Sequence, residues 1–194
     1  MVLNKKQGSV RIIGGKWRGR KVKFPSFAGL RPTHDRIRET LFNWLNAYIA
    51  GSNCLECFSG SGALSFEALS RGANHVTLLE KSPVVMRSLQ ENVDRLTTKE
   101  QATILSADVP TQVPQLNSAP FDIVFLDPPF SKGLVQPTIH WLCKEDILKE
   151  HAFIYVEIER GHELLDLPDN WETYRHKHTS TIDYYLFRKM LGTP

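Results

Sequence analysis

Cysteines and long apolar runs are both scarce in this sequence of 194 residues. There are three cysteines, and this small, odd number excludes a disulfide-stabilised secreted domain. No apolar run approaches the roughly 18 residues that a membrane-spanning helix needs. Residues 1–10 lack the apolar stretch of a signal peptide. We therefore expect a cytoplasmic protein with reduced thiols and no membrane contact.

Internal repeats, low-complexity tracts and extremes of composition are also missing. Apolar residues make up 41% of the chain and charged residues 23%, which is ordinary for globular proteins and excludes collagen-like and disordered chains. A chain of this length predicts one globular domain. We expect it to be a monomer, because the sequence has no obvious apolar surface stripe.

The net charge of +3 conceals an uneven distribution. Residues 1–40 hold eleven Lys and Arg against two Asp and Glu, a net charge of +9, whereas the remaining residues carry a net charge of −6. Aromatic residues are interleaved with the basic ones. A basic arm on a mildly acidic body indicates a polyanionic partner that is bound by one end of the molecule.

The basic segment predicts a β-hairpin over residues 10–25. Its tight turn is placed at Gly14-Gly15, because glycine readily adopts the positive φ of such turns. A helix is predicted over residues 34–48, where apolar residues recur at helical spacing, with Thr33 as its N-cap. We expect residues 1–30 to form a basic N-terminal extension and residues 31–194 to form the main domain.

From residue 53 onward, predicted strands alternate with predicted helices. The strands cover residues 53–57, 75–80, 102–106, 121–126 and 152–159, and the helices cover residues 63–70, a segment opened by Ser82-Pro83, and residues 138–149. Two final alternating runs, 171–178 and 181–188, predict an antiparallel pair. This order predicts an α/β fold whose sheet is mostly parallel, with right-handed crossovers, and is made mixed by the terminal pair.

A glycine-rich loop follows the first strand of this α/β region. Gly60 and Gly62 allow a ligand to approach the backbone at a helix N-terminus. Ser65 stands where the dinucleotide fingerprint has its third glycine, and this disfavours a nicotinamide-dependent oxidoreductase. The carboxylate of Glu56 suits a ligand that carries an ammonium or sulfonium group better than a pyrophosphate.

Two further acidic residues follow strands. Glu80 ends the second strand of the α/β region, where a carboxylate can accept hydrogen bonds from both hydroxyls of a ribose. Asp108 follows the third strand, where it could accept a hydrogen bond from an adenine amino group. Both positions favour an adenosine-containing ligand.

The sequence Asp127-Pro128-Pro129-Phe130 comes directly after an apolar strand. The two prolines remove N–H donors and leave a stiff turn that is rich in acceptors. Asp127 and the Pro128 carbonyl can each accept a proton of one –NH2 group, and Phe130 offers a face for stacking a planar base. This motif predicts recognition of an exocyclic amine on a flat ring.

The basic hairpin supplies the candidate nucleic-acid contacts, in which a stacking Trp17 is flanked by phosphate-binding cations. The expected RNA-binding residues are Arg11, Lys16, Trp17, Arg18, Arg20, Lys21, Arg31 and Arg36. Cys54 and Cys57 have a C-x-x-C spacing, but an offset of three places two side chains on opposite faces of a strand. We therefore expect buried thiols and no metal site.

Taken together, these motifs resemble the class I S-adenosylmethionine-dependent methyltransferases, and more narrowly the RsmD family. The resemblance covers nearly the whole chain. It rests on residues 11–20 (RIIGGKWRGR), 31–45 (RPTHDRIRETLFNWL), 58–64 (FSGSGAL), 67–73 (EALSRGA) and 127–130 (DPPF). The glycine loop and Asp-Pro-Pro-Phe are common to many amino-methyltransferases, whereas the two N-terminal motifs narrow the substrate.

The resemblance implies transfer of a methyl group from S-adenosylmethionine to N2 of a guanine in 16S ribosomal RNA, within a small ribosomal subunit or an assembly particle. The product of the cofactor is S-adenosylhomocysteine, and no metal is implied. The implied fold is a Rossmann-like sheet of seven strands in the order 3-2-1-4-5-7-6, with strand 7 antiparallel.

The resemblance also implies roles for single residues. Glu80 would hold the ribose, Asp108 the adenine, and Asp127–Phe130 the guanine. The methionine part would be held by Thr33, Glu56, Phe58, Ser59, Gly60, Ser61 and Gly62.

We hypothesise a direct in-line displacement, since no nucleophile and base pair accompany the Asp-Pro-Pro-Phe motif. Adenine N6 methylation of DNA or RNA is the main alternative, because the same motif serves that reaction. A glutamine methyltransferase is disfavoured because it would resemble Asn-Pro-Pro-Tyr. A non-enzymatic RNA-binding protein is disfavoured by the intact motifs.

Overall fold

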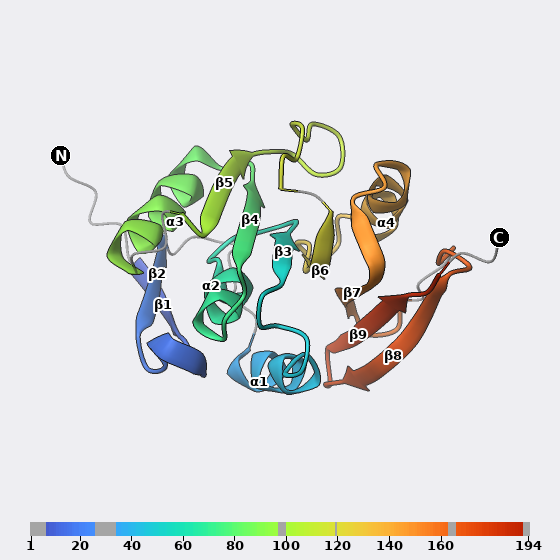
Figure 1. The fold of residues 1–194 in the computed structure, drawn as a ribbon, viewed down its shortest axis with the longest axis horizontal. Helices are drawn as coiled ribbons and strands as arrows, with labels where there is room; N and C mark the ends of the chain where they lie inside the picture. Colours follow the sequence, from blue (N-terminus) through green and yellow to red (C-terminus); the bar gives the residue numbers. More distant parts are fainter. Residues whose placement is uncertain (1–6, 26–33, 97–99, 119, 163–165, 192–194) are drawn as a thin grey trace.

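The structure is a computed structural model that describes residues 7–25, 34–96, 100–118, 120–162 and 166–191 (Figure 1). Its elements, in chain order, are β1 (Gln7–Arg11), the 3-10 turn η1 (Gly15–Trp17), β2 (Lys21–Pro25), α1 (Asp35–Trp44), β3 (Asn53–Glu56), α2 (Ala63–Ser70), β4 (His75–Glu80), α3 (Pro83–Leu96), β5 (Ala102–Ser106), β6 (Phe121–Leu126), α4 (Val135–Lys144), β7 (Leu148–Glu159), β8 (Trp171–His178) and β9 (Ile182–Lys189).

Seven of the strands form one sheet in the order β5-β4-β3-β6-β7-β9-β8. The strands from β5 to β7 are parallel, and β9 runs antiparallel to both of its neighbours. Counted from β3 as the first strand, this order is 3-2-1-4-5-7-6. The predicted Rossmann-like topology, including the antiparallel last strand, is therefore confirmed.

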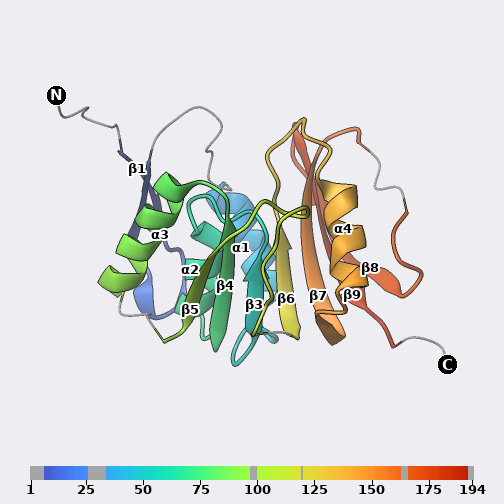
Figure 2. The same cartoon turned by 90° about the horizontal axis from the view of Figure 1, so that it is seen from above.

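Two hydrophobic clusters cover the two faces of the sheet. One packs the strands against α1, α2, α3 and the hairpin of β1 and β2, and the other packs them against α4. Figure 2 shows α4 on the opposite side of the sheet from α1, α2 and α3. Cys54 belongs to the first cluster and Cys57 to the second, both at most 1% exposed. The prediction of buried thiols on opposite faces is confirmed.

The predicted N-terminal hairpin exists, but its turn differs. β1 and β2 pair antiparallel, and they are joined by a loop that contains η1 rather than by a two-residue turn at Gly14-Gly15. The reason is a tertiary contact: Gly15 has φ +74°, and a Cβ there would overlap the carbonyl oxygen of Ser70 at the end of α2. The two glycines allow this loop to lie against α2.

A buried charge network fixes that loop. Both oxygens of the fully buried Glu67 carboxylate accept backbone N–H groups, from Ile13 at 2.7 Å and Gly14 at 2.8 Å. Glu67 also pairs with Arg71 at 2.7 Å, and the buried Arg38 guanidinium lies 3.7 Å from it. A buried charge that is satisfied by so many partners is costly to disturb, so this network joins the hairpin to α1 and α2.

The predicted boundaries of two helices and one strand differ from the structure by several residues. α1 begins at Asp35 with His34 at its N-cap position and ends at Trp44, and the proposed cap, Thr33, lies outside the described residues. The helix predicted over residues 138–149 begins earlier and ends at Lys144, since Asp146 adopts φ 47° and breaks it. β7 begins at Leu148, and its register with β6 shifts between Phe121 and Ile123.

Candidate active site

The carboxyl ends of the parallel strands open onto a cavity of about 460 Å3, which is the size of a small-molecule or cofactor site. Five adjacent strands each bring one acidic residue to it, as open α/β sheets bring ligand-binding groups to that edge. In sheet order from β5 to β7, these residues are Asp108, Glu80, Glu56, Asp127 and Glu157. The first four were predicted as site residues, and the structure brings them together.

The loop between β3 and α2 forms one wall of the cavity. Phe58, Ser59, Gly60 and Ser61 line it, as predicted. Gly62 does not: it is the N-cap of α2 with φ 72°, and a Cβ there would press on Phe66 and Leu89. The turn and the close packing therefore both require a glycine at position 62.

Glu56 is a buried carboxyl group of the cavity with a strongly raised pKa. Only 4% of it is exposed, and one carboxylate oxygen accepts the backbone N–H of Ser65 at 3.3 Å. Burial, together with the smaller effects of the nearby charges of Asp127 and Glu80, raises the pKa of Glu56 to about 8. A buried carboxyl group of this kind is well suited to receive a cationic group from a ligand.

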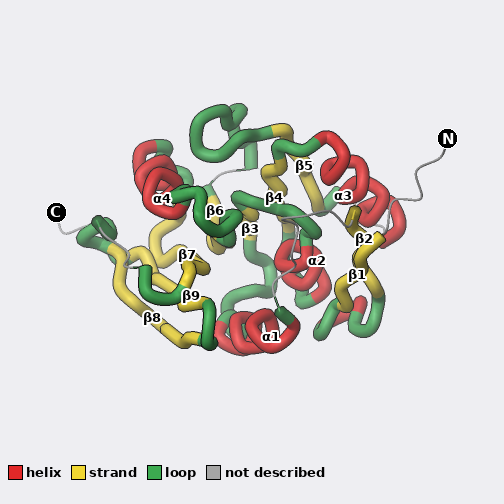
Figure 3. Tube along the Cα trace, turned by 180° about the vertical axis from the view of Figure 1, so that it is seen from behind, coloured by secondary structure: helices red, strands yellow, loops and turns green. Residues whose placement is uncertain are grey.

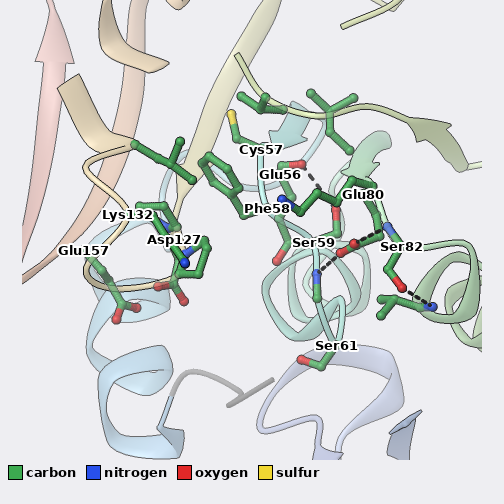
Figure 4. Close-up of a pocket in the computed structure, with 18 of the residues that line it drawn as sticks. Glu56, Cys57, Phe58, Ser59, Ser61, Glu80, Ser82, Asp127, Lys132 and Glu157 are labelled. Carbon is green, nitrogen blue, oxygen red and sulfur yellow. Dashed lines mark hydrogen bonds between the residues drawn. The ribbon is translucent and has the colours of Figure 1, made fainter. Parts of the chain in front are cut away.

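The Glu80 carboxylate links the loop between β3 and α2 to the start of α3 through two hydrogen bonds. Its carboxylate accepts the N–H of Gly60 at 3.0 Å and the N–H of Ser82 at 2.8 Å (Figure 4). Ser82 caps α3 through a hydrogen bond from Val85 to its hydroxyl. Asp108 lies farther along the same edge, 3.4 Å from the Lys81 ammonium.

The Asp-Pro-Pro-Phe motif forms the opposite wall. All four residues line the cavity, and Asp127 follows the buried strand β6 directly. Phe130 remains 39% exposed, an unusual position for a large apolar ring. Its face is therefore accessible for stacking.

Several residues that line the cavity were not predicted as site residues, and among them His34, Lys132 and Glu157 carry ionisable side chains that could meet a ligand. His34 and Lys132 line the cavity from the start of α1 and from the loop after the Asp-Pro-Pro-Phe motif. Glu157 lines it from β7, although only 2% of its surface is exposed. The sequence signal for Glu157 was a carboxylate between the apolar residues Val156 and Ile158 of a strand.

The basic residues that were predicted to bind RNA and that the structure describes do not line the cavity. The loop from Gly14 to Arg20 packs beside Ser70, at the end of α2 that points away from the glycine loop. Since α2 has eight residues, the separation is about 12 Å at 1.5 Å per residue. Figure 3 shows the hairpin beside α3, far from β7. Arg36 is nearer, two residues after His34.

The prediction that Trp17 stacks on RNA is wrong, because Trp17 is only 7% exposed and belongs to the hydrophobic core. Its flanking basic side chains are exposed, as are Arg11 and Arg36. Arg31 lies outside the described residues. The charged residues of the hairpin therefore remain candidate phosphate contacts, and its indole does not.

Within the described ranges, no three His, Cys, Asp or Glu residues are grouped so as to hold a metal ion. In the same part of the chain, no helix has the length and apolar character needed to cross a membrane.

Comparisons with known proteins agree with the fold. A family model described as "Conserved hypothetical protein 95" matches residues 10–188. The chain is 46% identical over 184 residues to ribosomal RNA small subunit methyltransferase D of Haemophilus influenzae, covering 94% of this chain and 95% of that protein. It is 44% identical over 182 residues to the Escherichia coli K12 protein of the same name, covering 94% and 91%. This chain belongs to the RsmD family.

Solved structures show the same architecture for this RsmD-family chain. A putative methyltransferase from Escherichia coli has a TM-score of 0.82 at 43% identity, covering 94% of this chain and 99% of that one. A 16S rRNA N2 G1207 methyltransferase from Thermus thermophilus, in complex with AdoMet and guanosine, has a TM-score of 0.66 at 19% identity, covering 95% and 50%. At this low identity, the similarity to the Thermus thermophilus protein shows only that the two chains share a fold.

Proposed function

We propose that this protein is an S-adenosylmethionine-dependent methyltransferase that modifies N2 of a guanine in small-subunit ribosomal RNA. The observation that carries the proposal is the arrangement of Glu56 and Asp127. Glu56 is a deeply buried carboxyl group at the end of β3 that a bound cation would stabilise. Asp127 begins the Asp-Pro-Pro-Phe motif at the end of the neighbouring strand β6, where it can accept N–H protons.

The residues present fit the cofactor along its whole length. Glu56 would pair with the ammonium of its methionine part, beside the loop from Phe58 to Ser61. Glu80 would accept from the ribose hydroxyls, and Asp108 from the adenine amine. When bound there, the cofactor supplies an electrophilic methyl group on its sulfonium.

Asp127 and the Pro128 carbonyl would hold the target amine. Guanine N2 is a weak nucleophile, because its lone pair is delocalised into the ring. Accepting both of its N–H protons favours a more pyramidal nitrogen, and Phe130 fixes the plane of the base by stacking. Positioning of this kind can lower a barrier by roughly 7–11 kcal/mol. The base must leave its helix to enter, since N2 faces the minor groove.

The ribosomal substrate rests on the relatives and on charge. The relatives of this chain from Haemophilus influenzae and Escherichia coli are named ribosomal RNA small subunit methyltransferases. The exposed basic side chains of the hairpin would bind phosphates around the target. Such a substrate places the reaction in the cytoplasm.

The test uses methyl-labelled S-adenosylmethionine and small ribosomal subunits from cells that lack the gene for this protein. The RNA is digested and the labelled nucleoside is identified. We expect the label in N2-methylguanosine. Label in N6-methyladenosine would refute the substrate atom and keep the chemistry, and no label in any nucleoside would refute the proposed function.

A further inference from the structure

Glu157 is a buried acidic residue of the cavity that the cofactor and the target amine leave without a role. The register between β6 and β7 pairs Phe125 with Tyr155 and Leu126 with Val156. One residue further, the same register places Asp127 beside Glu157. Because side chains alternate across a strand, Asp127 and Glu157 project to the same face of the sheet, and neighbouring strands lie about 4.8 Å apart.

The Glu157 carboxylate is held in a fixed orientation. The Tyr155 hydroxyl donates a hydrogen bond to it at 2.7 Å, and Tyr155 itself is fully buried. Burial raises the pKa of Tyr155, and the charges of Glu157 and Asp127 raise it as well, which places both carboxylates near this phenol. Figure 4 shows Glu157, Asp127 and Lys132 at the same end of the cavity.

The edge of guanine matches these acceptors. Its Watson–Crick edge presents three N–H protons, two on N2 and one on N1, whereas adenine has an unprotonated N1 that accepts hydrogen bonds. Asp127 and the Pro128 carbonyl account for the two N2 protons under the proposed function. A third acceptor beside Asp127 is then opposite N1.

We propose that Glu157 is the residue that selects guanine, by accepting the N1–H of the target base. An adenine in the same place would set its N1 lone pair against the carboxylate, and two facing acceptors repel one another. Lys132, an exposed cation lining the same cavity, is placed to donate to O6. The inference rests on the proposed function and identifies what the target end of the cavity recognises.

The variant Glu157→Gln tests this with little change of shape. An amide can donate to an unprotonated N1, which the carboxylate cannot. The substrates are small subunits reconstituted with RNA that carries, at the mapped target position, either guanine or 2-aminopurine. 2-Aminopurine keeps the N2 amine, but its N1 is an acceptor and it has no O6. The change in preference between wild type and variant therefore reports on Glu157, because the loss of O6 is common to both proteins. Glu150→Gln, an exposed position on the same strand, is the matched control.

For the wild-type protein and the control, we expect kcat/KM to favour guanine over 2-aminopurine by about tenfold or more, the discrimination typical of a mismatched buried polar pair. Glu157→Gln should lower kcat/KM for guanine and raise it for 2-aminopurine, so that the preference narrows or reverses. Binding of S-adenosylhomocysteine should stay within a few-fold of wild type.

An unchanged preference in Glu157→Gln would overturn the inference while the proposed function stands. So would an equal loss on both bases together with a loss of S-adenosylhomocysteine binding, which would indicate a structural role only. If the wild-type protein methylates no guanine N2, the proposed function fails, and this inference fails with it.

Discussion

The buried Glu56 should make the ligand-free protein less stable than it could be at neutral pH. Its pKa is raised by burial to about 8 in the folded protein, against an ordinary value of 4.5. Between these two values, the unfolded chain releases a proton that the folded protein retains. Stability therefore falls as pH rises through this window, by about 1.4 kcal/mol per pH unit.

Glu56→Gln removes the ionisable group and keeps its shape. The variant and the wild type should have similar free energies of unfolding near pH 4.5, below which Glu56 keeps its proton in both the folded and the unfolded chain. As pH rises, the variant should become the more stable of the two. At pH 7, about 2.5 units higher, the difference should be on the order of 3 kcal/mol in favour of the variant. The same substitution removes the expected partner of the ligand ammonium, so S-adenosylhomocysteine should bind at least about a hundredfold more weakly.

The assay is urea unfolding of the ligand-free protein at pH 5, 6 and 7, monitored by tryptophan fluorescence. Glu91→Gln, an exposed carboxylate on α3, is the control and should follow the wild type at each pH. Parallel stability curves for the wild type and Glu56→Gln would refute the reasoning, because they would mean that Glu56 ionises in the folded protein as it does in the unfolded chain.

Three further outcomes are expected. Asp127→Ala should abolish methyl transfer and leave S-adenosylhomocysteine affinity within a few-fold by calorimetry, because Asp127 is assigned to the target base. Replacing Arg18 and Arg20 by alanine should weaken RNA binding and reduce the slope of log K against log salt by about two, measured by titration at several salt concentrations. Glu67→Ala should cost about 3–5 kcal/mol of unfolding free energy and speed hydrogen exchange at the Ile13 amide, because it removes the buried carboxylate that accepts this N–H and pairs with Arg71 and Arg38.

Each of these three has a contrary result. Joint loss of cofactor binding and activity would move Asp127 to the cofactor side of the cavity. An unchanged salt slope would remove the hairpin loop from the RNA interface. A change below about 1 kcal/mol at Glu67 would mean that the hairpin is held by its apolar contacts instead.

Sequence position alone located most of the site, because the fold converts strand ends into a shared edge. Glu56, Glu80, Asp108 and Asp127 each end or follow an apolar strand, so predicting the strands also placed these side chains together. Glu157 escaped this reasoning, since it lies inside an apolar strand. Its place in the cavity depends on the register of β7 with β6, which no local pattern encodes.

In the N-terminal segment, by contrast, local sequence patterns led to wrong predictions. The residue types at Gly14-Gly15 are typical of a tight turn, and a tryptophan flanked by basic residues is typical of a nucleic-acid contact. In the structure, the glycines allow approach to α2 and the indole fills the core. The two glycines and the tryptophan are needed because this loop packs against α2, where Gly14 and Trp17 bond to Glu67 and Ser70. These contacts join residues 53 positions apart, so no local sequence pattern reveals them.

The separation of charge in this fold bears on how RNA can approach it. Five acidic residues and two lysines, Lys81 and Lys132, line the cavity, so its acidic side chains outnumber its cations and disfavour a phosphate backbone there. The exposed cations of the hairpin lie beyond the far end of α2. Under the proposed function, the RNA backbone is therefore held by the hairpin at about 12 Å or more from the reacting atoms. A single unpaired base, whose edge carries N–H donors and no charge, is the part of the substrate that this acidic cavity admits.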